Sequence, residues 1–295
     1  MNTELQQLAQ TLLPTEAVRE LLSRCINEDG GFEGDVTSKS IVQEDATSRF
    51  AINIRGRGVI SGLEPLSRSM DFFGDISMTL RHKDGDCVEN KTIAHLEGQL
   101  QTVLLAERTI LNVLGHASGI ATNTRKFVDA IAHTECLVCD TRKTTPGLRM
   151  LDKYAVACGG GTPHRIGLHD AALYKDNHIT GLDDPVAKLA EAIKIVRQDR
   201  SLQFVEVEVD SMQQLEEALL LDVDFVLLDN FSNEQLQQAV EMRNNAVHQP
   251  SLEASGGITI ETVCEIAQTG VDRVAIGALT HQTSWLDIGL DAIDE

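Results

Sequence analysis

Basic side chains are concentrated in one stretch of an otherwise acidic chain. Between Cys139 and His178 there are six basic and four acidic residues, a net charge of +2, whereas the other 255 residues carry 19 basic and 41 acidic side chains. Only Arg243 and Arg273 are basic after Arg200. A local positive charge within a chain of net charge −20 attracts a small anion and concentrates it there. This stretch is therefore the first candidate for a substrate site.

The first basic motif, DTRKTTPGLR over residues 140–149, sets Arg142 beside Lys143. A guanidinium can bind a carboxylate through two parallel hydrogen bonds, whereas an ammonium acts as a point charge. A lone Arg-Lys pair is usually a solvated surface pair. This pair directly follows the strand-like run CLVCDT, which ends at Thr141, and we therefore expect it to bind an anion at the strand end.

The second basic motif, GGGTPHRIGLHDAALYKDNHI over residues 159–179, contains three glycines, then His164 and Arg165, and finally Lys175. Glycines let the backbone approach a ligand closely. Lys175 ends the apolar run AALY, where an unpaired ammonium would be costly to bury. It must therefore pair with an acid or hold a ligand anion, and we favour the ligand.

Carboxylates lie near the ends of two further apolar runs. VEVEVD places Glu206, Glu208 and Asp210 on one face of a strand, since side chains alternate with a period of two. VLLD ends in Asp229. Taken singly, each acid would more often be an ion-pair partner. Opposite a basic surface, however, such carboxylates suit Mg²⁺ and sugar hydroxyls.

A glycine pair follows another apolar run, in SGGI over residues 255–258, with Thr259 as a possible helix cap. Backbone N–H groups beside a helix N-terminus can hold phosphate. The same pair could equally form a tight turn without a ligand.

The elements that must position these groups are short apolar runs separated by helical patterns. The runs end at Thr141, Asp176, Asp210, Asn230, Gly257 and Leu279. Helical patterns at Ser211–Leu221 and Phe231–Arg243 fill two of the gaps. Each parallel strand needs a crossover helix, so the alternation predicts a parallel β/α barrel with its polar groups at the carboxyl ends of the strands. The main rival is a doubly wound open sheet, which no G-x-G-x-x-G after a strand supports.

The N-terminal part has a different pattern. A helical pattern covers Thr15–Ile26, and strand-like runs lie between Arg49 and Glu64, which predicts an α+β unit. A long helical stretch, Val103–Ala132, follows. Gly115 and Gly119 mark its expected break, and we expect a domain boundary near them.

Composition excludes several classes of partner. The net charge of −20 disfavours nucleic acid and anionic membranes, and no apolar run approaches the ~20 residues of a membrane span. The N-terminal sequence MNTELQQLAQ lacks the basic and apolar regions of a signal peptide, so we expect a cytoplasmic protein.

The six cysteines are scattered. Cys136 and Cys139 form a C-x-x-C, but within an apolar run, which favours a strand over a redox or zinc site.

Taken together, several motifs resemble those of the quinolinate phosphoribosyltransferases: ERTILN, SGIAT, DTRKTTPGLR, HRIGL, KDNHI, VEVEV, LLDN and SGGI. The resemblance covers nearly the whole chain, from GDVTS at residues 34–38 to GALTH at 277–281. It implies an α/β fold with an N-terminal α/β sandwich domain over residues 1–118, joined by the C-terminal tail 280–295. Residues 119–279 would form an incomplete, seven-stranded parallel β/α barrel.

The same resemblance implies an activity. Such enzymes join quinolinate to 5-phosphoribosyl-1-diphosphate and release pyrophosphate and carbon dioxide. The product, nicotinate mononucleotide, serves NAD biosynthesis. They require Mg²⁺ and work as homodimers with shared active sites, so the expected partners are two small-molecule substrates and a second copy of the chain.

The family's binding residues carry over onto matching positions. For quinolinate the resemblance implies Thr141, Arg142, Lys143, His164, Arg165 and Lys175, with Arg108 entering the neighbouring subunit's site. For the donor it implies Glu208, Asp229, Ser255, Gly256, Gly257, Gly277 and His281, with Glu208 and Asp229 also holding Mg²⁺, directly or through water. The catalytic set would be Lys143, Lys175, Glu208 and Asp229. Two departures, Thr162-Pro163 before the histidine and GHASG before Ile120, leave the charged positions intact.

Three alternatives remain open at this stage. A sibling phosphoribosyltransferase could use another anion, as in nicotinate-type or molybdenum-associated homologues. A barrel aldolase could use Lys175 to form a Schiff base, although it would have no use for so many cations. A metabolite-binding protein could use the same barrel without catalysis.

Overall fold

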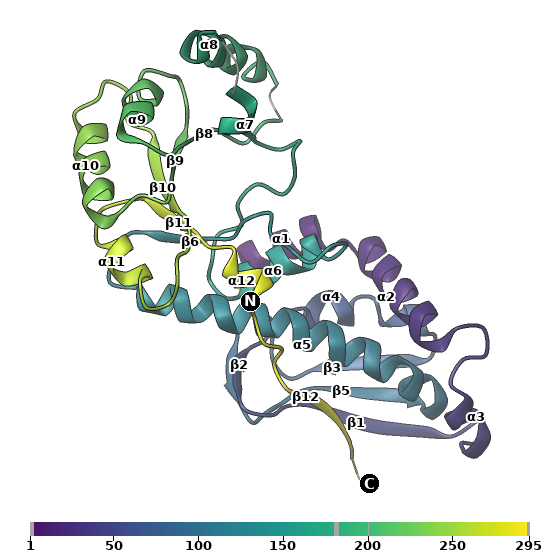
Figure 1. The fold of residues 1–295 in the computed structure, drawn as a ribbon. Coiled ribbons are helices and arrows are strands. Elements are labelled where there is room, and N and C mark those ends of the chain that lie inside the picture. The colour runs from purple at the N-terminus through teal and green to yellow at the C-terminus, as the bar shows by residue number, and fades with distance from the viewer. Residues whose placement is uncertain (1–2, 180–182, 200, 294–295) are drawn as a thin grey trace. The chain divides into compact units, whose positions relative to one another are not determined.

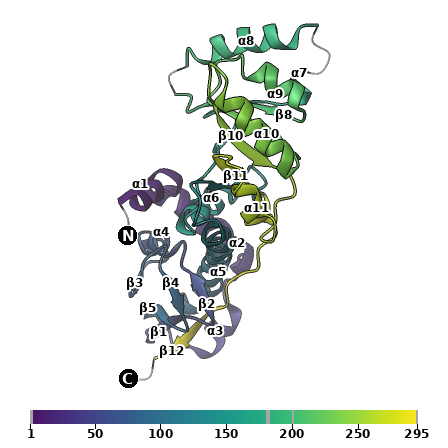
Figure 2. The ribbon, with the colours of Figure 1, turned by 90° about the vertical axis from the view of Figure 1, so that its left-hand side faces the viewer.

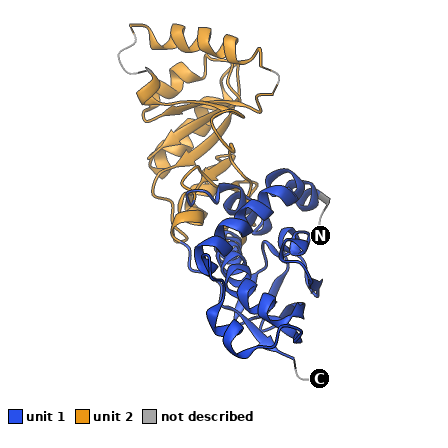
Figure 3. Ribbon diagram, turned by 90° about the vertical axis from the view of Figure 1, so that its right-hand side faces the viewer, with its two compact units in different colours: residues 1–125, 145–160, 283–295 blue, residues 126–144, 161–282 orange. Residues whose placement is uncertain are grey.

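The computed structural model describes residues 3–179, 183–199 and 201–293, and Figures 1 and 2 show its elements from two directions. The outermost residues of the expected domains, 1–2 and 294–295, lie outside this description. The chain divides into two compact units (Figure 3). Unit 1 comprises residues 1–125, 145–160 and 283–295, and unit 2 comprises residues 126–144 and 161–282. Among the described helices, none is both long and apolar enough to cross a membrane.

Unit 1 is built on an antiparallel sheet of four strands in the order β12-β1-β5-β3. These strands are β1 (Thr47–Ile54), β3 (Ile76–Leu80), β5 (Thr92–Gln99) and β12 (Ile288–Ala292), and β2 (Arg57–Val59) pairs separately with β4 (Cys87–Glu89). Its helices are α1 (Thr3–Leu12), α2 (Thr15–Gly30), α3 (Val36–Ile41), α4 (Leu63–Ser67), the 3₁₀ turn η1 (Met70–Phe73) and α6 (Arg149–Cys158). The tail after residue 283 thus contributes an edge strand to the N-terminal sheet. The segment 145–160, expected within the second domain, belongs to unit 1 instead.

The long helix α5 (Leu100–Ala130) covers one face of this sheet and runs unbroken through Gly115 and Gly119 (Figure 1). The expected break was therefore wrong. A Cβ at Gly119 would lie 2.4 Å from the carbonyl oxygen of Ser284, and one at Gly115 would lie 3.1 Å from that of Leu286. The two glycines do not end the helix; they let the C-terminal segment pass against it. Glycine is needed here for close approach rather than for a turn.

A buried carboxylate organises the start of α4. Asp84 is 2% exposed and accepts hydrogen bonds from the backbone N–H of Leu63 at 2.9 Å, the N–H of Glu64 at 3.2 Å and the hydroxyl of Tyr154 at 2.8 Å. Burial raises its pKa to about 6, so at pH 7 the carboxylate is mostly charged and can accept all three.

We expect Asp84→Asn to lower the free energy of unfolding by about 1–3 kcal/mol at pH 7. The amide NH₂ would face one of the three donors that the carboxylate now accepts, and that buried donor would lose its acceptor. Urea unfolding followed by circular dichroism measures this change. The exposed Glu89→Gln serves as the charge-matched control. A loss at Asp84 no larger than that of the control would contradict the capping role.

Unit 2 contains a parallel sheet of six strands in the order β6-β11-β10-β9-β8-β7. They are β6 (Leu137–Cys139), β7 (Ala172–Tyr174), β8 (Val205–Val209), β9 (Phe225–Asp229), β10 (Ser251–Ser255) and β11 (Arg273–Ala275). All six correspond to the predicted apolar runs. The first strand pairs with the last, and a single parallel bridge joins Thr162 to Cys139 at the β6 edge. The structure thus confirms a parallel α/β unit with six paired strands in the described part of the chain.

The helices of unit 2 are α7 (Asp176–Ile179), α8 (Pro185–Val196), α9 (Met212–Ala218), α10 (Asn233–Asn244), α11 (Val263–Ala267) and α12 (Ala278–His281). The predicted helices at 211–221 and 231–243 are confirmed as α9 and α10. Ser211 caps α9, and Ser232 forms a capping box with Gln235 at the start of α10. Cys136 and Cys139 are buried free thiols beside and within β6, as the strand interpretation predicts.

Candidate active site

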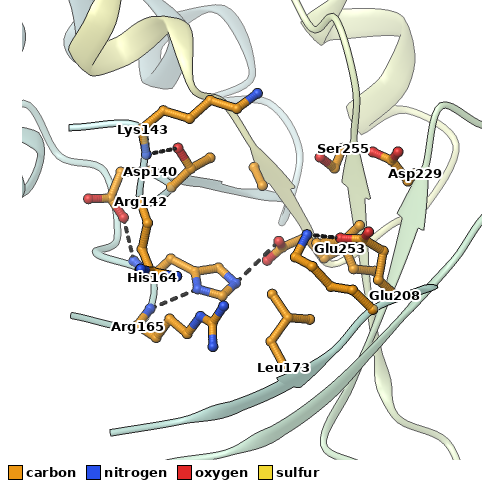
Figure 4. Close-up of a pocket in the computed structure, with 14 residues that line it drawn as sticks. Asp140, Arg142, Lys143, His164, Arg165, Leu173, Glu208, Asp229, Glu253 and Ser255 are labelled. Atoms are coloured by element: carbon orange, nitrogen blue, oxygen red, sulfur yellow. Dashed lines mark hydrogen bonds and ion pairs between the residues drawn. The ribbon is translucent and has the colours of Figure 1, made fainter. Parts of the chain in front are cut away.

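A cavity of about 460 Å³ opens in unit 2 at the carboxyl ends of the parallel strands (Figure 4). Its lining combines cations, carboxylates and a few apolar side chains: Asp140, Thr141, Arg142, Lys143, His164, Arg165, Leu173, Lys175, Glu208, Leu227, Asp229, Glu253, Ser255 and Ala275. Nine of these residues were predicted as site residues. Asp140 and Glu253 are charged lining residues that sequence reasoning missed as members of the site.

Strand register brings the lining together. Adjacent parallel strands pair Cys139 with Ala275, Ala275 with Ser255, and Ser255 with Asp229, so these four residues form one row across the sheet. Arg142 and Lys143 follow the end of this row in the sequence. The predicted convergence of strand ends is therefore confirmed, since parallel strands present their carboxyl ends at one edge.

Arg142 and Arg165 form the cationic side of the cavity. Arg165 is 7% exposed, and its Nη1 donates to the carbonyl of Ala171 at 3.3 Å. Burial and the nearby charge of Arg142 both lower the pKa of Arg165. Within the described residues no acidic side chain forms an ion pair with Arg142. Two neighbouring guanidinium groups in a cavity are chemically able to hold an anion that carries more than one negative charge.

Lys175 follows β7 and forms an ion pair with Glu208 of β8. The sequence left two partners open for Lys175, an acid or a ligand anion. In the structure its partner is the acid. Glu208 is largely buried and Lys175 is about one-third exposed at its side chain. An anion entering the cavity can compete with Glu208 for the ammonium, and the released carboxylate would then be free to accept hydroxyl groups.

Asp229 and Ser255 lie side by side at the ends of β9 and β10 (Figure 4). Asn230 donates from Nδ2 to Asp229 at 2.8 Å and from its backbone N–H to the carbonyl of Ser255 at 2.9 Å. A Cβ at Gly256 would lie 2.2 Å from the Asn230 side chain, and Gly256 has a φ of +105°. Glycine is therefore required here so that Asn230 can hold the Asp229 carboxylate in place.

Of the residues predicted to bind phosphate, only some lie together at the cavity. Gly256, Gly257, Gly277 and His281 do not line this cavity, and the helix expected after Thr259 begins only at Val263. The helix N-terminus is thus not adjacent to the glycine pair, because a turn over residues 259–262 separates them.

Lys143 nevertheless lies next to Gly277, one of the residues predicted to bind phosphate. A Cβ at Gly277 would lie 2.9 Å from Cδ of Lys143 and 3.0 Å from Nε2 of His281, so these three residues are neighbours. Thr280 also donates a hydrogen bond to the Lys143 carbonyl at 2.7 Å. Figure 4 shows the Lys143 side chain directed away from Arg165. Lys143 therefore lies on the side of the predicted phosphate residues.

Both ring nitrogens of His164 are engaged by the protein. Nδ1 accepts the backbone N–H of Arg165 at 2.7 Å, and Nε2 lies 3.0 Å from a carboxylate oxygen of Glu206 and 3.3 Å from one of Glu253. Burial opposes a charged ring, but hydrogen bonds to these acids raise the pKa of His164 to about 9, while burial also raises the pKa of Glu253. Because Nδ1 accepts an N–H, the ring proton lies on Nε2, which faces the two carboxylates.

Arg108 belongs to α5 in unit 1, is exposed, and lies 3.7 Å from the neighbouring Glu107. In this single chain it is an ordinary surface pair. Its expected role in a neighbouring subunit stays a prediction.

Comparisons with known proteins agree with this geometry. The "Quinolinate phosphoribosyl transferase, C-terminal domain" family matches residues 120–291, and the corresponding N-terminal domain family matches residues 35–118. The nicotinate-nucleotide pyrophosphorylase [carboxylating] of Mycobacterium leprae is 40% identical over 280 residues, which cover 94% of this chain and 97% of the relative.

Solved structures give the same result. The nicotinate-nucleotide pyrophosphorylase of Ehrlichia chaffeensis matches with a TM-score of 0.83 at 39% identity, covering 93% of this chain and 98% of that one. The enzyme from Francisella tularensis matches with a TM-score of 0.87 at 35% identity, covering 95% and 97%. The chain therefore belongs to the quinolinate phosphoribosyltransferase family.

Proposed function

We propose that this protein transfers the phosphoribosyl group of 5-phosphoribosyl-1-diphosphate to quinolinate, with loss of carbon dioxide, in NAD biosynthesis. The products are nicotinate mononucleotide and pyrophosphate. The relatives' name, nicotinate-nucleotide pyrophosphorylase [carboxylating], describes the same reaction in reverse. The observation that carries the proposal is the cavity of unit 2, where Arg142 and Arg165 face Glu208 and Asp229 at the ends of parallel strands.

Quinolinate is a flat pyridine with two adjacent carboxylates, and the cationic side suits it. Arg142, Arg165 and Lys175 would hold the carboxylates, so that the ring nitrogen faces the anomeric carbon of the donor. Thr141 lies beside them in the lining. Leu173, Leu227 and Ala275 supply apolar walls for the ring. We further propose that Arg108 reaches the site of a second subunit, which would make the enzyme a homodimer.

The donor would lie on the opposite side of the cavity. Glu208 and Asp229 would accept its ribose hydroxyls, and the phosphates would lie by the residues around the strand ends: Lys143, Ser255, Gly256, Gly257, Gly277 and His281. The closeness of Lys143 to Gly277 and His281 supports this placement. The two carboxylates are hard oxygen donors that face the cavity and fit Mg²⁺, held directly or through water. When bound, the ion would neutralise charge on the departing diphosphate.

The chain's own groups then act by position and charge. As the bond from the anomeric carbon to the diphosphate breaks, the carboxylates of Glu208 and Asp229 stabilise the positive charge on the ribose. The pyridine nitrogen forms the new bond and becomes positively charged. That charge stabilises the electron pair left on the adjacent ring carbon when its carboxylate departs as carbon dioxide, and the carbon then takes a proton. We assign assistance at this step to Lys143 and Lys175.

We also propose that unit 2 is the incomplete seven-stranded barrel of the resemblance. Pairing of the first strand with the last supports this, because a doubly wound sheet would place its first strand in the interior. The bridge from Thr162 to Cys139 marks where the seventh strand would lie. The free cysteines suit a reducing compartment, and we propose the cytoplasm.

The alternatives fit the site less well. Nicotinate carries one carboxylate and would leave one guanidinium without a partner. An aldolase needs a lysine that is free to attack a carbonyl, whereas Lys175 forms an ion pair with Glu208.

Incubating the purified protein with quinolinate, the donor and Mg²⁺ tests the proposal. We expect nicotinate mononucleotide, carbon dioxide and pyrophosphate in equal amounts. Faster product formation from nicotinate would favour the sibling activity. Tight binding without pyrophosphate release would identify a binding protein instead.

A further inference from the structure

Beneath the cavity, four buried charged or titratable side chains form one cluster: His164, Glu206, Glu253 and Arg273. Glu206 and Glu253 are 0% exposed, and Arg273 is 7% exposed. Nε of Arg273 pairs with Glu253, and its Nη2 lies 3.2 Å from Glu206. Its guanidinium also stacks on the ring of Phe225, 3.5 Å from the centroid. Burying this much charge is costly, so stability alone does not explain the cluster.

The cluster meets the cavity through two side chains, since His164 and Glu253 both line it, and His164 is the one that contacts the backbone of a cavity arginine. Nε2 of His164 lies against both glutamates, and Nδ1 accepts the N–H of Arg165, so the ring bridges the buried acids and the backbone of a cavity arginine. The His164 side chain is only 6% exposed. With both nitrogens used by the protein, the ring is poorly placed to bind a substrate carboxylate itself.

The backbone that carries Arg165 has no regular secondary structure, yet four consecutive N–H groups are bonded. Asp140 accepts the N–H of His164 at 2.6 Å, and the His164 ring accepts that of Arg165. Asp170 accepts the next two N–H groups, each at 2.7 Å. This segment is thus fixed by side chains in place of a sheet or helix.

We propose that Glu206, Glu253 and Arg273 are positioning residues for substrate binding: acting through the ring of His164, they fix the backbone of Arg165 and so aim its guanidinium at a carboxylate of quinolinate. The inference rests on the proposed function and gives His164, which lines the cavity, a role in fixing the neighbouring arginine. By distance, His164 and the two glutamates could hold a metal ion. The guanidinium of Arg273, which forms ion pairs with both acids, already acts as their counter-ion.

Glu253→Gln is the test, because it keeps the side chain's shape and removes its charge. We expect the KM for quinolinate to rise about 10- to 100-fold, since a small misplacement of a binding group costs this much. The KM for the donor should stay within about twofold. Glu216→Gln, at an exposed position of helix α9, is the charge-matched control and should change neither value.

A double-mutant cycle separates positioning from general loss of structure. If Glu253 acts through Arg165, adding Glu253→Gln to Arg165→Ala should raise the KM for quinolinate by no more than about twofold further. An undiminished effect of Glu253→Gln in that background would overturn the proposal, as would an equal rise in both KM values for the single variant.

Should Glu253→Gln fail to fold, the double variant Glu253→Gln/Arg273→Met removes a positive and a negative charge together and is the better tolerated change. It is expected to show the same selective rise, and an unchanged KM for quinolinate would overturn the proposal. Wild-type turnover is measured first. A wild-type protein that makes no nicotinate mononucleotide refutes the proposed function, whereas normal turnover with an unaffected Glu253→Gln variant refutes only the positioning role.

Discussion

Arg142→Ala is expected to raise the KM for quinolinate by about 100-fold or more, while the KM for the donor changes little. Arg142 lines the cavity and has no ion-pair partner among the described residues, so a substrate carboxylate would supply its main electrostatic contact. Two charge-assisted hydrogen bonds contribute about 1.5–3 kcal/mol each, and each 1.4 kcal/mol is tenfold in affinity. Steady-state kinetics with each substrate varied in turn measures the change.

Two further variants make the result specific. Arg142→Lys keeps the charge but loses the planar pair of donors, and it should recover only part of the affinity. Lys188→Ala removes an exposed cation from α8, outside the cavity lining, and should leave the kinetics unchanged. A quinolinate KM for Arg142→Ala equal to that of Lys188→Ala would remove Arg142 from the binding site.

The second large effect concerns the donor side. Asp229→Asn is expected to lower kcat by roughly 10²- to 10³-fold, because it removes a preorganised negative charge from beside the developing positive charge on the ribose. Asparagine keeps the size of the side chain and can still hydrogen-bond to Asn230. Product formation in a single turnover, measured with the enzyme in excess and saturating for binding, isolates this step from substrate binding and product release.

Asp210→Asn is the matched control for Asp229→Asn. Asp210 directly follows β8, is exposed and does not line the cavity, so its charge should not reach the substrate. Nearly equal kcat values for the two variants would show that Asp229 acts only through the general acidity of the surface.

Much of unit 2 is predictable from the sequence because parallel strands are short apolar runs bounded by polar residues. The runs before Arg142, Lys175 and Asp229 give β6, β7 and β9, and the rule that parallel strands end together brings their polar neighbours into one cavity. The predicted roles of individual side chains stay predictions, to be tested by the variants above.

Other features depend on contacts that a linear pattern does not contain. Gly115 and Gly119 predict a helix break, but the passing tail uses both for close approach within one continuous helix. The sequence does show a charge in each strand, since Glu253 lies between Leu252 and Ala254 in β10 and Arg273 begins β11. Their pairing, however, follows only from the register of β10 with β11, which places them directly opposite each other.

We propose that the cavity of unit 2 recognises two adjacent carboxylates on one aromatic ring. Calorimetric titration of the wild-type protein with quinolinate and with nicotinate tests it most directly, because the two ligands differ by a single carboxylate. We predict that quinolinate binds about 10- to 100-fold more tightly, since nicotinate leaves one guanidinium unsatisfied. Equal affinities, or tighter binding of nicotinate, would contradict the claim.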